Sequence, residues 1–449
     1  MEAVLANDER RTTNDEALIE VRDLNTHYSV RGSFVDRLRG RESGSVAAVD
    51  GVSFDLRHGE VFGLVGESGS GKTTLGRTLL GLVEATSGSI KLRGEEITGL
   101  SEAEMRPLRR RLQIVFQDPH ASLNPAMTIG AAIGDPLRFH GIASGKAERE
   151  KLVAEALERV GLAPASQFAD KYPTDLSGGQ KQRAVLARAI ILGPDILVAD
   201  EPVSMLDMSV RAKILELMIE LKSELDLTYV YITHDLATAK FFCDRIAIMY
   251  LGRIVELGPA EKIYADPKHP YTQSLLRAIP EPDPTRSVPR DLPRGEIPDA
   301  VAPPLGCRFH PRCPRAFEVC GWESRDFRAA LEHRWTQIPE YQYEGERGLI
   351  GDLDSLDQAS FETVFHSAGG HSGENAERVL AAMRGEMPDD PMWKGIAEAD
   401  VVEDGVRLKF HEGLEPRQLD VDGVEVECHL HDPEALAAAR KLGANVEQL

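Results

Sequence analysis

Three short apolar runs in the chain each end in polar residues. They are VFGLV at 61–65, ILVA at 196–199 and YVYI at 229–232. A continuous apolar run of this length is typical of a parallel strand that is buried on both faces. Because open α/β sheets bind ligands at the carboxyl ends of their strands, we expect the polar residues after these runs to carry chemistry.

Other segments show different periods. LIEVRDL at 18–24 alternates apolar and polar residues, which predicts a half-buried strand, and SGSIKLRGEEI at 87–97 predicts an antiparallel excursion. The segment 146–162 predicts an amphipathic helix that Gly161 stops. The apolar stripe of this helix comprises Leu152, Val153, Ala156, Leu157 and Val160.

Composition and punctuation predict three parts. We expect residues 1–16 to form a disordered tail, 17–280 to form the main domain and 281–449 to form a C-terminal region. The prolines of HPYTQSLLRAIPEPDPTRSVPRDLP indicate a linker between the last two. The C-terminal region has an acidic stretch at 340–423, and GVRLKF…QLDVDGVEVEC at its end predicts a small β unit.

Charge and length narrow the function classes. The chain has 449 residues, a net charge of −21 and a pI of about 5.1. An acidic surface argues against nucleic acid as the main partner, because phosphate contacts need a basic face. No apolar run reaches the ~18 residues that cross a bilayer, and the N-terminus lacks a secretory pattern, so we expect an intracellular protein that reaches membranes only through partners.

The first strong motif is GESGSGKT, which fits G-x-x-x-x-G-K-[ST] and follows a predicted strand. Its glycines let backbone N–H groups point at a phosphate chain, Lys72 adds charge for the β- and γ-phosphates, and Thr73 can bind Mg²⁺. The alternative is a glycine-rich turn with a chance lysine. The predicted nucleotide contacts are Gly66, Glu67, Ser68, Gly69, Ser70, Gly71, Lys72, Thr73 and Thr74.

Polar residues at other strand ends complete a candidate site for hydrolysis. Asp200 is placed to hold Mg²⁺, and Glu201 is the candidate base that polarises the attacking water. Gln117 could reach both Mg²⁺ and this water, and His234 could contact the γ-phosphate. Tyr28 could stack on adenine. Each of these last three also has an ordinary structural interpretation, as a surface amide, a core histidine or an exposed tyrosine.

A second glycine pair, Gly178–Gly179, lies ahead of a helix in DLSGGQKQRAVLARAI. Two adjacent glycines cost backbone entropy when the chain folds, so they indicate that the bare backbone at this helix N-terminus has a use, such as anion binding. The order of GESGSGKTT, FQDP, LSGGQ, ILVADE, SMLD and THD resembles the nucleotide-binding subunits of ABC transporters over residues 17–280. The resemblance implies an α/β fold of the P-loop NTPase type. It has a RecA-like parallel-sheet core, an antiparallel β subdomain and a helical subdomain.

In that family two subunits pack head to tail. The resemblance implies that Ser177, Gly178, Gly179 and Gln180 contact the γ-phosphate of a nucleotide held by the opposite subunit, with Asp207 at the same interface. ATP binding would then close the dimer and hydrolysis would release it. The chain departs from the family at Met205, where a small residue is usual.

Further phrases narrow the resemblance. VFQDPHASLNPAMTIG, DEPVSMLDMSV, HPYTQSLLRAIP and GCRFHPRCP resemble the ATPase subunits of oligopeptide/dipeptide importers. This implies a second, paralogous ATPase, two integral membrane permease subunits, an extracellular substrate-binding protein and a peripheral place on the cytoplasmic face of the membrane. The alternative is a soluble ABC ATPase without transport, which usually has a coiled-coil insertion or tandem domains.

Three of the five cysteines cluster at 307, 313 and 320, which in an intracellular chain suggests a metal or cofactor before disulfides. The family resemblance implies a 4Fe–4S cluster on Cys307, Cys313, Cys320 and Cys428, although the segment before Cys428 is much longer than in the family. Four thiolates also suit zinc, and reduced thiols without a ligand are the third possibility. Cys243 is expected to pack in the core.

Overall fold

The computed structural model describes residues 17–29, 45–143, 145–279, 295–370 and 373–448. The predicted tail at 1–16 lies outside the described residues. The chain divides into two compact units, of which the first comprises residues up to 254 together with 258–261, and the second comprises 255–257 and everything from 262 onward. No helix in the described segments is both long and apolar enough to span a bilayer.

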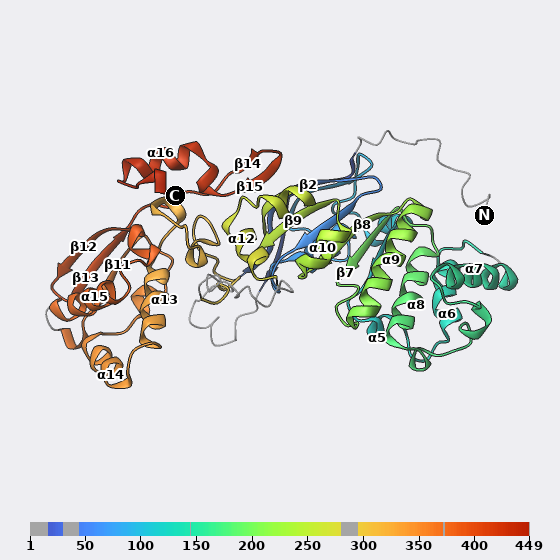
Figure 1. Ribbon diagram of the computed structural model, residues 1–449, viewed down its shortest axis with the longest axis horizontal. Helices are drawn as coiled ribbons and strands as arrows, with labels where there is room; N and C mark the ends of the chain where they lie inside the picture. Colours follow the sequence, from blue (N-terminus) through green and yellow to red (C-terminus); the bar gives the residue numbers. More distant parts are fainter. Residues whose placement is uncertain (1–16, 30–44, 144, 280–294, 371–372, 449) are drawn as a thin grey trace. The chain divides into compact units, whose positions relative to one another are not determined.

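A parallel sheet forms the core of the first unit (Figure 1). Its strands follow the order β9 (Arg245–Tyr250), β3 (Val61–Val65), β8 (Thr228–Thr233), β7 (Ile196–Asp200) and β6 (Leu112–Val115). Every residue of β3, β7 and β8 is buried, which confirms the three strands predicted from apolar runs. Their carboxyl ends lie at one edge because all neighbouring pairs are parallel.

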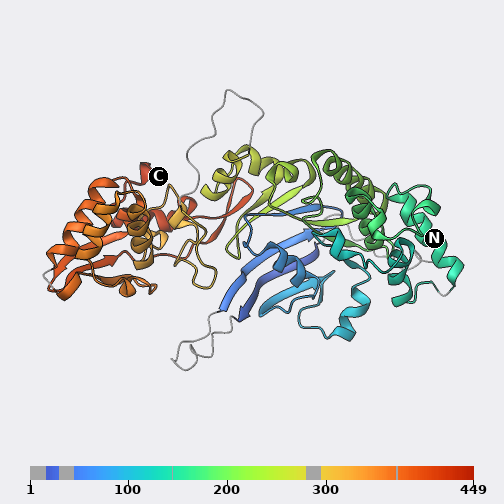
Figure 2. The ribbon, with the colours of Figure 1, turned by 90° about the horizontal axis from the view of Figure 1, so that it is seen from below.

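An antiparallel sheet, drawn in blue in Figure 2, accompanies this core. It has the order β2 (Ser45–Arg57), β1 (Ala17–Ser29), β4 (Ser87–Leu92) and β5 (Glu95–Glu96). The alternating strand at 18–24 and the excursion at 87–97 are thus both confirmed. Gly88, with φ of 95°, lets the start of β4 approach the backbone of Asp23 and Leu24.

The helices of the first unit form two sets. One set packs beside the parallel sheet and comprises α3 (Lys72–Leu79), α9 (Met208–Leu225) and α10 (Leu236–Phe242). The other set forms a helical subdomain and comprises α6 (Ile129–Phe139), α7 (Lys146–Arg159) and α8 (Gly178–Ile190). The amphipathic pattern at 146–162 is confirmed by α7, although Leu152 is only half-buried. Short helices α4 (Glu102–Leu108), α5 (Pro119–Ser122) and α11 (Ala260–Ala265) complete the set.

The second unit begins before the predicted linker. Its helix α12 (Pro270–Arg277) occupies the first part of the proline-containing segment, because Pro270 stands at the first helical turn, where proline is tolerated. The linker prediction is therefore wrong for 270–277, and the boundary expected at 280 lies beyond the division seen near 261. Residues 280–294 lie outside the described residues.

The end of the chain returns to this lobe as a hairpin. Strand β10 (Arg253–Pro259) pairs through Glu256 and Leu257 with β15 (Val424–Glu427), which pairs with β14 (Gln418–Val421). Helix α16 (Pro433–Lys441) follows. The hairpin ends directly at Cys428.

In the sequence, a region with its own sheet is inserted between Cys320 and the C-terminal hairpin. Its strands follow the order β11 (Glu362–His366), β13 (Gly405–Phe410) and β12 (Ile396–Val402). Helices α13 (Ser324–Trp335), α14 (Glu340–Leu349) and α15 (Glu374–Glu386) belong to it. The prediction of one small β unit is therefore wrong, because GVRLKF belongs to this sheet, whereas VEVE pairs with β10 and QLDV pairs with VEVE.

Candidate functional site

The phosphate loop lies between β3 and α3, as the motif predicts. Gly69 and Gly71 have φ values of 81° and 102°, in the left-handed region where side chains are strained. A Cβ on Gly66 would lie 2.2 Å from the carbonyl oxygen of Met249, and one on Gly71 would lie 2.0 Å from that of Ala48. These glycines are required by the backbone as well as by any phosphate. Ser68 is exposed, Ser70 is buried, and Glu67, Thr73 and Thr74 are half-buried.

Lys72 lies folded into this loop. Its Nζ donates to the carbonyl oxygens of Gly66 and Glu67, each at 2.8 Å, and to Ser70 Oγ at 3.3 Å. Burial lowers the pKa of Lys72, while the charges of Glu201, Asp200 and Glu67 oppose that shift. The amine is thus held where phosphate oxygens would replace carbonyl oxygens as its acceptors.

Asp200 ends β7 and faces Thr73. The Thr73 hydroxyl donates to Asp200 Oδ1 at 3.0 Å, and the carboxylate is 4% exposed. Burial raises the pKa of Asp200, and the Thr73 hydrogen bond only partly opposes this rise. A hydroxyl and a carboxylate from two elements thus converge, and these oxygen donors suit Mg²⁺.

Glu201 is the centre of a three-residue cluster. Its Oε2 accepts from Gln117 Nε2 at 3.0 Å and its Oε1 lies 2.9 Å from His234 Nδ1. Its backbone has φ of 47°, which a side-chain-bearing residue rarely adopts, and its N–H donates to the Ile232 carbonyl at 2.9 Å. The structure therefore brings together the three predicted catalytic residues from the ends of β6, β7 and β8.

The signature segment forms the N-terminus of α8. Ser177 is the N-cap: its Oγ accepts from Gln180 N at 3.3 Å, and Gln180 Oε1 accepts from Ser177 N at 3.0 Å. A Cβ on Gly179 would lie 2.7 Å from Val210 Cγ1, and one on Gly178 would lie 3.5 Å from Leu206 Cδ2. Gly179 thus has a packing role inside this chain that the sequence did not reveal.

Asp207 and Tyr28 complete the predicted nucleotide contacts. Asp207 is the N-cap of α9, and its Oδ1 accepts from Val210 N at 3.0 Å. Met205 is 62% exposed, so the departure from the family places a thioether on the surface. Tyr28 is 43% exposed near the end of β1, opposite Val46 of β2.

Comparison with known proteins identifies the family of this chain. The family model for the ABC transporter matches residues 49–204, and the model for the oligopeptide/dipeptide transporter C-terminal region matches 255–320. A putative peptide import ATP-binding protein of Brucella ovis is 48% identical over 303 residues, which cover 68% of this chain and 91% of that protein. The chain belongs to the ATP-binding proteins of oligopeptide/dipeptide-type ABC transporters.

Other known proteins are also similar to large parts of this chain. The oligopeptide transport ATP-binding protein AppF of Bacillus subtilis is 44% identical over 320 residues, covering 71% of this chain and 95% of AppF. The solved dimeric structure of the ATP-binding cassette MJ0796 with ADP and Pi has 29% identity and a TM-score of 0.48, covering 54% of this chain and 98% of that one. As an ABC ATP-binding protein, the chain is an ATPase.

The C-terminal family match ends at Cys320, yet the structure brings Cys428 to the other three cysteines. Cys307, Cys313, Cys320 and Cys428 line one small cavity in the second unit and are all buried. Burial raises the pKa of Cys313 to about 11 and that of Cys428 to about 12, and it also raises those of Cys307 and Cys320. The thiols therefore stay protonated unless a cationic group binds them.

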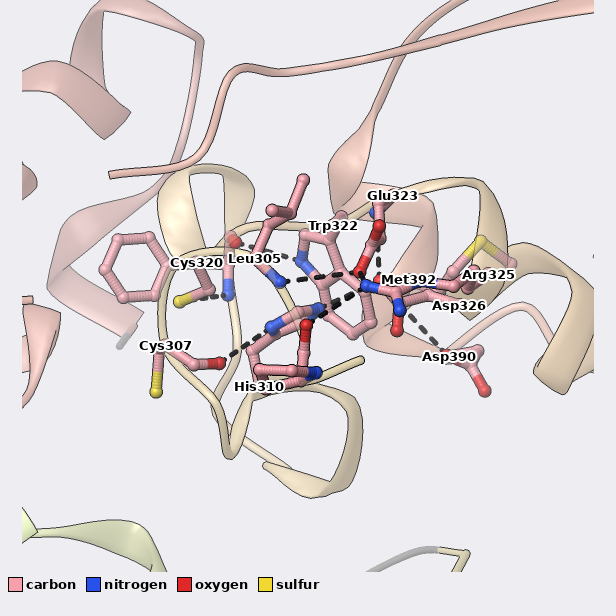
Figure 3. A network of polar contacts seen from close by, with 12 residues as sticks. Leu305, Cys307, His310, Cys320, Trp322, Glu323, Arg325, Asp326, Asp390 and Met392 are labelled. Carbon is pink, nitrogen blue, oxygen red and sulfur yellow. Dashed lines mark hydrogen bonds and ion pairs between the residues drawn. The ribbon is translucent and has the colours of Figure 1, made fainter. Parts of the chain in front are cut away.

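Hydrogen bonds fix the loop that carries three of these cysteines (Figure 3). Cys307 N donates to the Cys320 carbonyl at 3.0 Å, and Phe317 N donates to Cys320 Sγ at 3.4 Å. His310 Nδ1 lies 2.8 Å from the Cys307 carbonyl, and its Nε2 lies 2.9 Å from Asp326 Oδ2. The His310 ring therefore connects the Cys307 backbone to the Asp326 carboxylate.

Cys243 lies apart from this cavity. It is buried beside β3, and a Cβ on Gly63 would lie 2.8 Å from its Sγ. The prediction that Cys243 packs in the core is confirmed.

Proposed function

We propose that this chain is the ATP-hydrolysing subunit of an ABC importer that powers the uptake of oligopeptides or dipeptides across the cytoplasmic membrane. The carrying observation is Glu201, held between Gln117 and His234 beside the Thr73–Asp200 pair. This arrangement supplies a base, a polar contact for the γ-phosphate and oxygen ligands in one place. The names of the relatives, peptide import and oligopeptide transport ATP-binding proteins, support the cargo class.

The proposed mechanism uses a shared nucleotide. ATP binds to the phosphate loop of this chain, with Tyr28 against the adenine, and its γ-phosphate meets the Ser177 segment of a second ABC ATPase. Thr73, Asp200 and Gln117 would hold Mg²⁺, which neutralises charge on the phosphates. Glu201 takes a proton from the attacking water, and His234 contacts the γ-phosphate. Loss of that phosphate removes the bridge between the subunits.

The proposed partners follow from this division of labour. They are a paralogous ATPase, two integral membrane permease subunits and an extracellular substrate-binding protein. The chain would be peripheral at the cytoplasmic face of the membrane. In the alternative function, a soluble ABC ATPase, it would have no such partners.

We also propose that the four cysteines hold a 4Fe–4S cluster. Among the described residues, no three His, Cys, Asp or Glu side chains converge closely enough to hold a single metal ion. The thiolates of a cluster bind four different irons around a shared cavity, and these four cysteines line one cavity. Iron and labile sulfide in the anaerobically purified protein test the cofactor.

The function is tested by uptake and co-purification. In cells that depend on this transporter, Glu201→Gln should abolish accumulation of labelled peptides and reduce ATP turnover about 100-fold or more, because the base is lost while ATP binding remains. Glu220→Gln, an exposed position on α9, is the matched control and should retain both activities. The tagged chain should co-purify from solubilised membranes with two integral membrane proteins and a related ATPase. Unchanged uptake in Glu201→Gln, or recovery of the chain without membrane partners, contradicts the proposal.

A further inference from the structure

A histidine from outside the cysteine segments lines the four-cysteine cavity. His269 is the N-cap residue of α12, and its side chain is 1% exposed. Its Nδ1 accepts a hydrogen bond from the backbone N–H of Tyr271 at 3.0 Å. A backbone amide can only donate, so Nδ1 has no proton.

The proton of the neutral ring must therefore be on Nε2. The hydrogen bond from Tyr271 requires the neutral ring, and burial, with smaller contributions from His431 and His429, agrees with it by lowering the pKa of His269 to about 3. Nε2–H is buried and has no acceptor anywhere in the described residues. Buried donors are nearly always satisfied, so an unpaired one beside a cavity indicates that the occupant of the cavity supplies an acceptor.

This tautomer also excludes His269 as a metal ligand. To bind a metal, Nε2 would have to give up its proton to Nδ1. Nδ1–H would then point at the N–H of Tyr271, and two donors would oppose each other. The geometry leaves His269 only the role of a hydrogen-bond donor.

The surroundings hold the ring in this orientation. The buried carboxylate of Glu256 on β10 accepts from Lys268 N at 2.7 Å and from His269 N at 3.0 Å. The Phe309 ring lies 5.8 Å from the His269 ring and 5.2 Å from the Tyr271 ring. The donor is thus positioned before any group binds, which is typical of outer-shell partners in metal sites.

We propose that His269 donates its Nε2–H to a sulfur of the group held by Cys307, Cys313, Cys320 and Cys428. The inference rests on the cluster proposed above. Hydrogen bonds to cluster sulfurs withdraw electron density and stabilise the reduced form, so this donor raises the reduction potential. His269 is therefore a positioning residue that connects the start of α12 to the redox state of the cavity.

The test compares three anaerobically purified full-length proteins. His269→Asn keeps a side-chain acceptor for Tyr271 N but is too short to present the donor. His431→Asn is the matched control, because His431 contacts the Lys268 carbonyl and does not line the cavity. Iron, labile sulfide and the midpoint potential are measured for each, together with pulsed EPR of the reduced protein containing ¹⁵N-histidine.

His269→Asn should retain iron and sulfide, show a more negative midpoint potential, and lose a weak ¹⁵N coupling present in the wild type. His431→Asn should match the wild type. An unchanged potential with a full cluster overturns the role of His269. Loss of the cluster from both His269→Asn and His269→Gln, with circular dichroism unchanged, or a strong coupling typical of direct ligation, also overturns it. A wild type without iron and sulfide overturns the cluster itself and leaves the ATPase function untouched.

Discussion

At the scale of single residues, the geometry of the proposed catalytic site depends on the backbone as much as on side chains. Glu201 adopts a φ of 47°, which costs free energy that the surrounding contacts must offset. The cost is tolerated because the buried strand β7 and the bond from Glu201 N to the Ile232 carbonyl fix the chain there. The side chain is thereby directed between Gln117 and His234.

Gly179 provides a test of packing at this scale. A Cβ at Gly179 would meet Val210 Cγ1 at 2.7 Å, so Gly179→Ala should destabilise the protein by about 1–3 kcal/mol through overpacking. Val210→Ala in the same chain should restore most of that loss. Urea unfolding of both single variants and of the double variant measures the coupling.

Gly178→Ala is the matched control, since its Cβ would make an ordinary 3.5 Å contact with Leu206. If Gly178→Ala and Gly179→Ala unfold at the same urea concentration, the packing role assigned to Gly179 is wrong.

At the scale of elements, the sequence predicted the strands and helix N-termini that depend on short, continuous segments. Continuous apolar runs identified β3, β7 and β8, and the phosphate-loop and signature motifs located both helix N-termini. The site in the first unit follows because parallel strands bring Gln117, Glu201 and His234 to one edge.

The cysteine site was harder to predict because its parts are distant in sequence. Cys428 reaches the cavity only because β15 pairs with β10, a pairing across more than 150 residues that no local pattern encodes. His269 was missed for a different reason. Its run, HPYT, has the pattern of a capped helix start, but its unpaired Nε2 emerges only from three-dimensional packing.

The inserted region has its own stabilising element. Arg334 on α13 is 2% exposed; it donates to Glu346 Oε1 at 2.7 Å and to Glu386 Oε2 at 2.8 Å. Arg334→Ala leaves the buried Glu346 without its charged partner and should lower the free energy of unfolding by about 3–5 kcal/mol. Thermal unfolding followed by tryptophan fluorescence reports this directly, because Trp335 donates to Glu346.

Lys409→Ala serves as the comparison within the same region. Lys409 pairs with Glu398 at 3.7 Å and both side chains are more than half exposed, so its loss should change stability by less than about 1 kcal/mol. Equal effects of the two substitutions would show that the Arg334 pair is not a stabilising centre.

At the scale of the whole molecule, the two units carry different chemistry. The first unit has the phosphate loop, Glu201 and the signature segment, and the second has the four-cysteine cavity and the inserted region. The prolines after residue 268 predicted a linker, but α12 occupies 270–277. Proline at a first helical turn is compatible with a helix, which explains why part of the expected linker is helical.

The central claim is that a second subunit completes each nucleotide-binding site. The most direct measurement compares the rate of ATP hydrolysis by the purified monomeric chain with that by the assembled transporter, each identified by size-exclusion chromatography with light scattering, for the wild type and Ser177→Arg. We predict that the monomer binds ATP without turnover, that the ATPase dimer in the assembled transporter hydrolyses it, and that Ser177→Arg lowers this rate about 10-fold or more while ATP binding to the monomer is unchanged. A monomer that hydrolyses ATP as fast as the assembled dimer, with no effect of Ser177→Arg, would contradict the account.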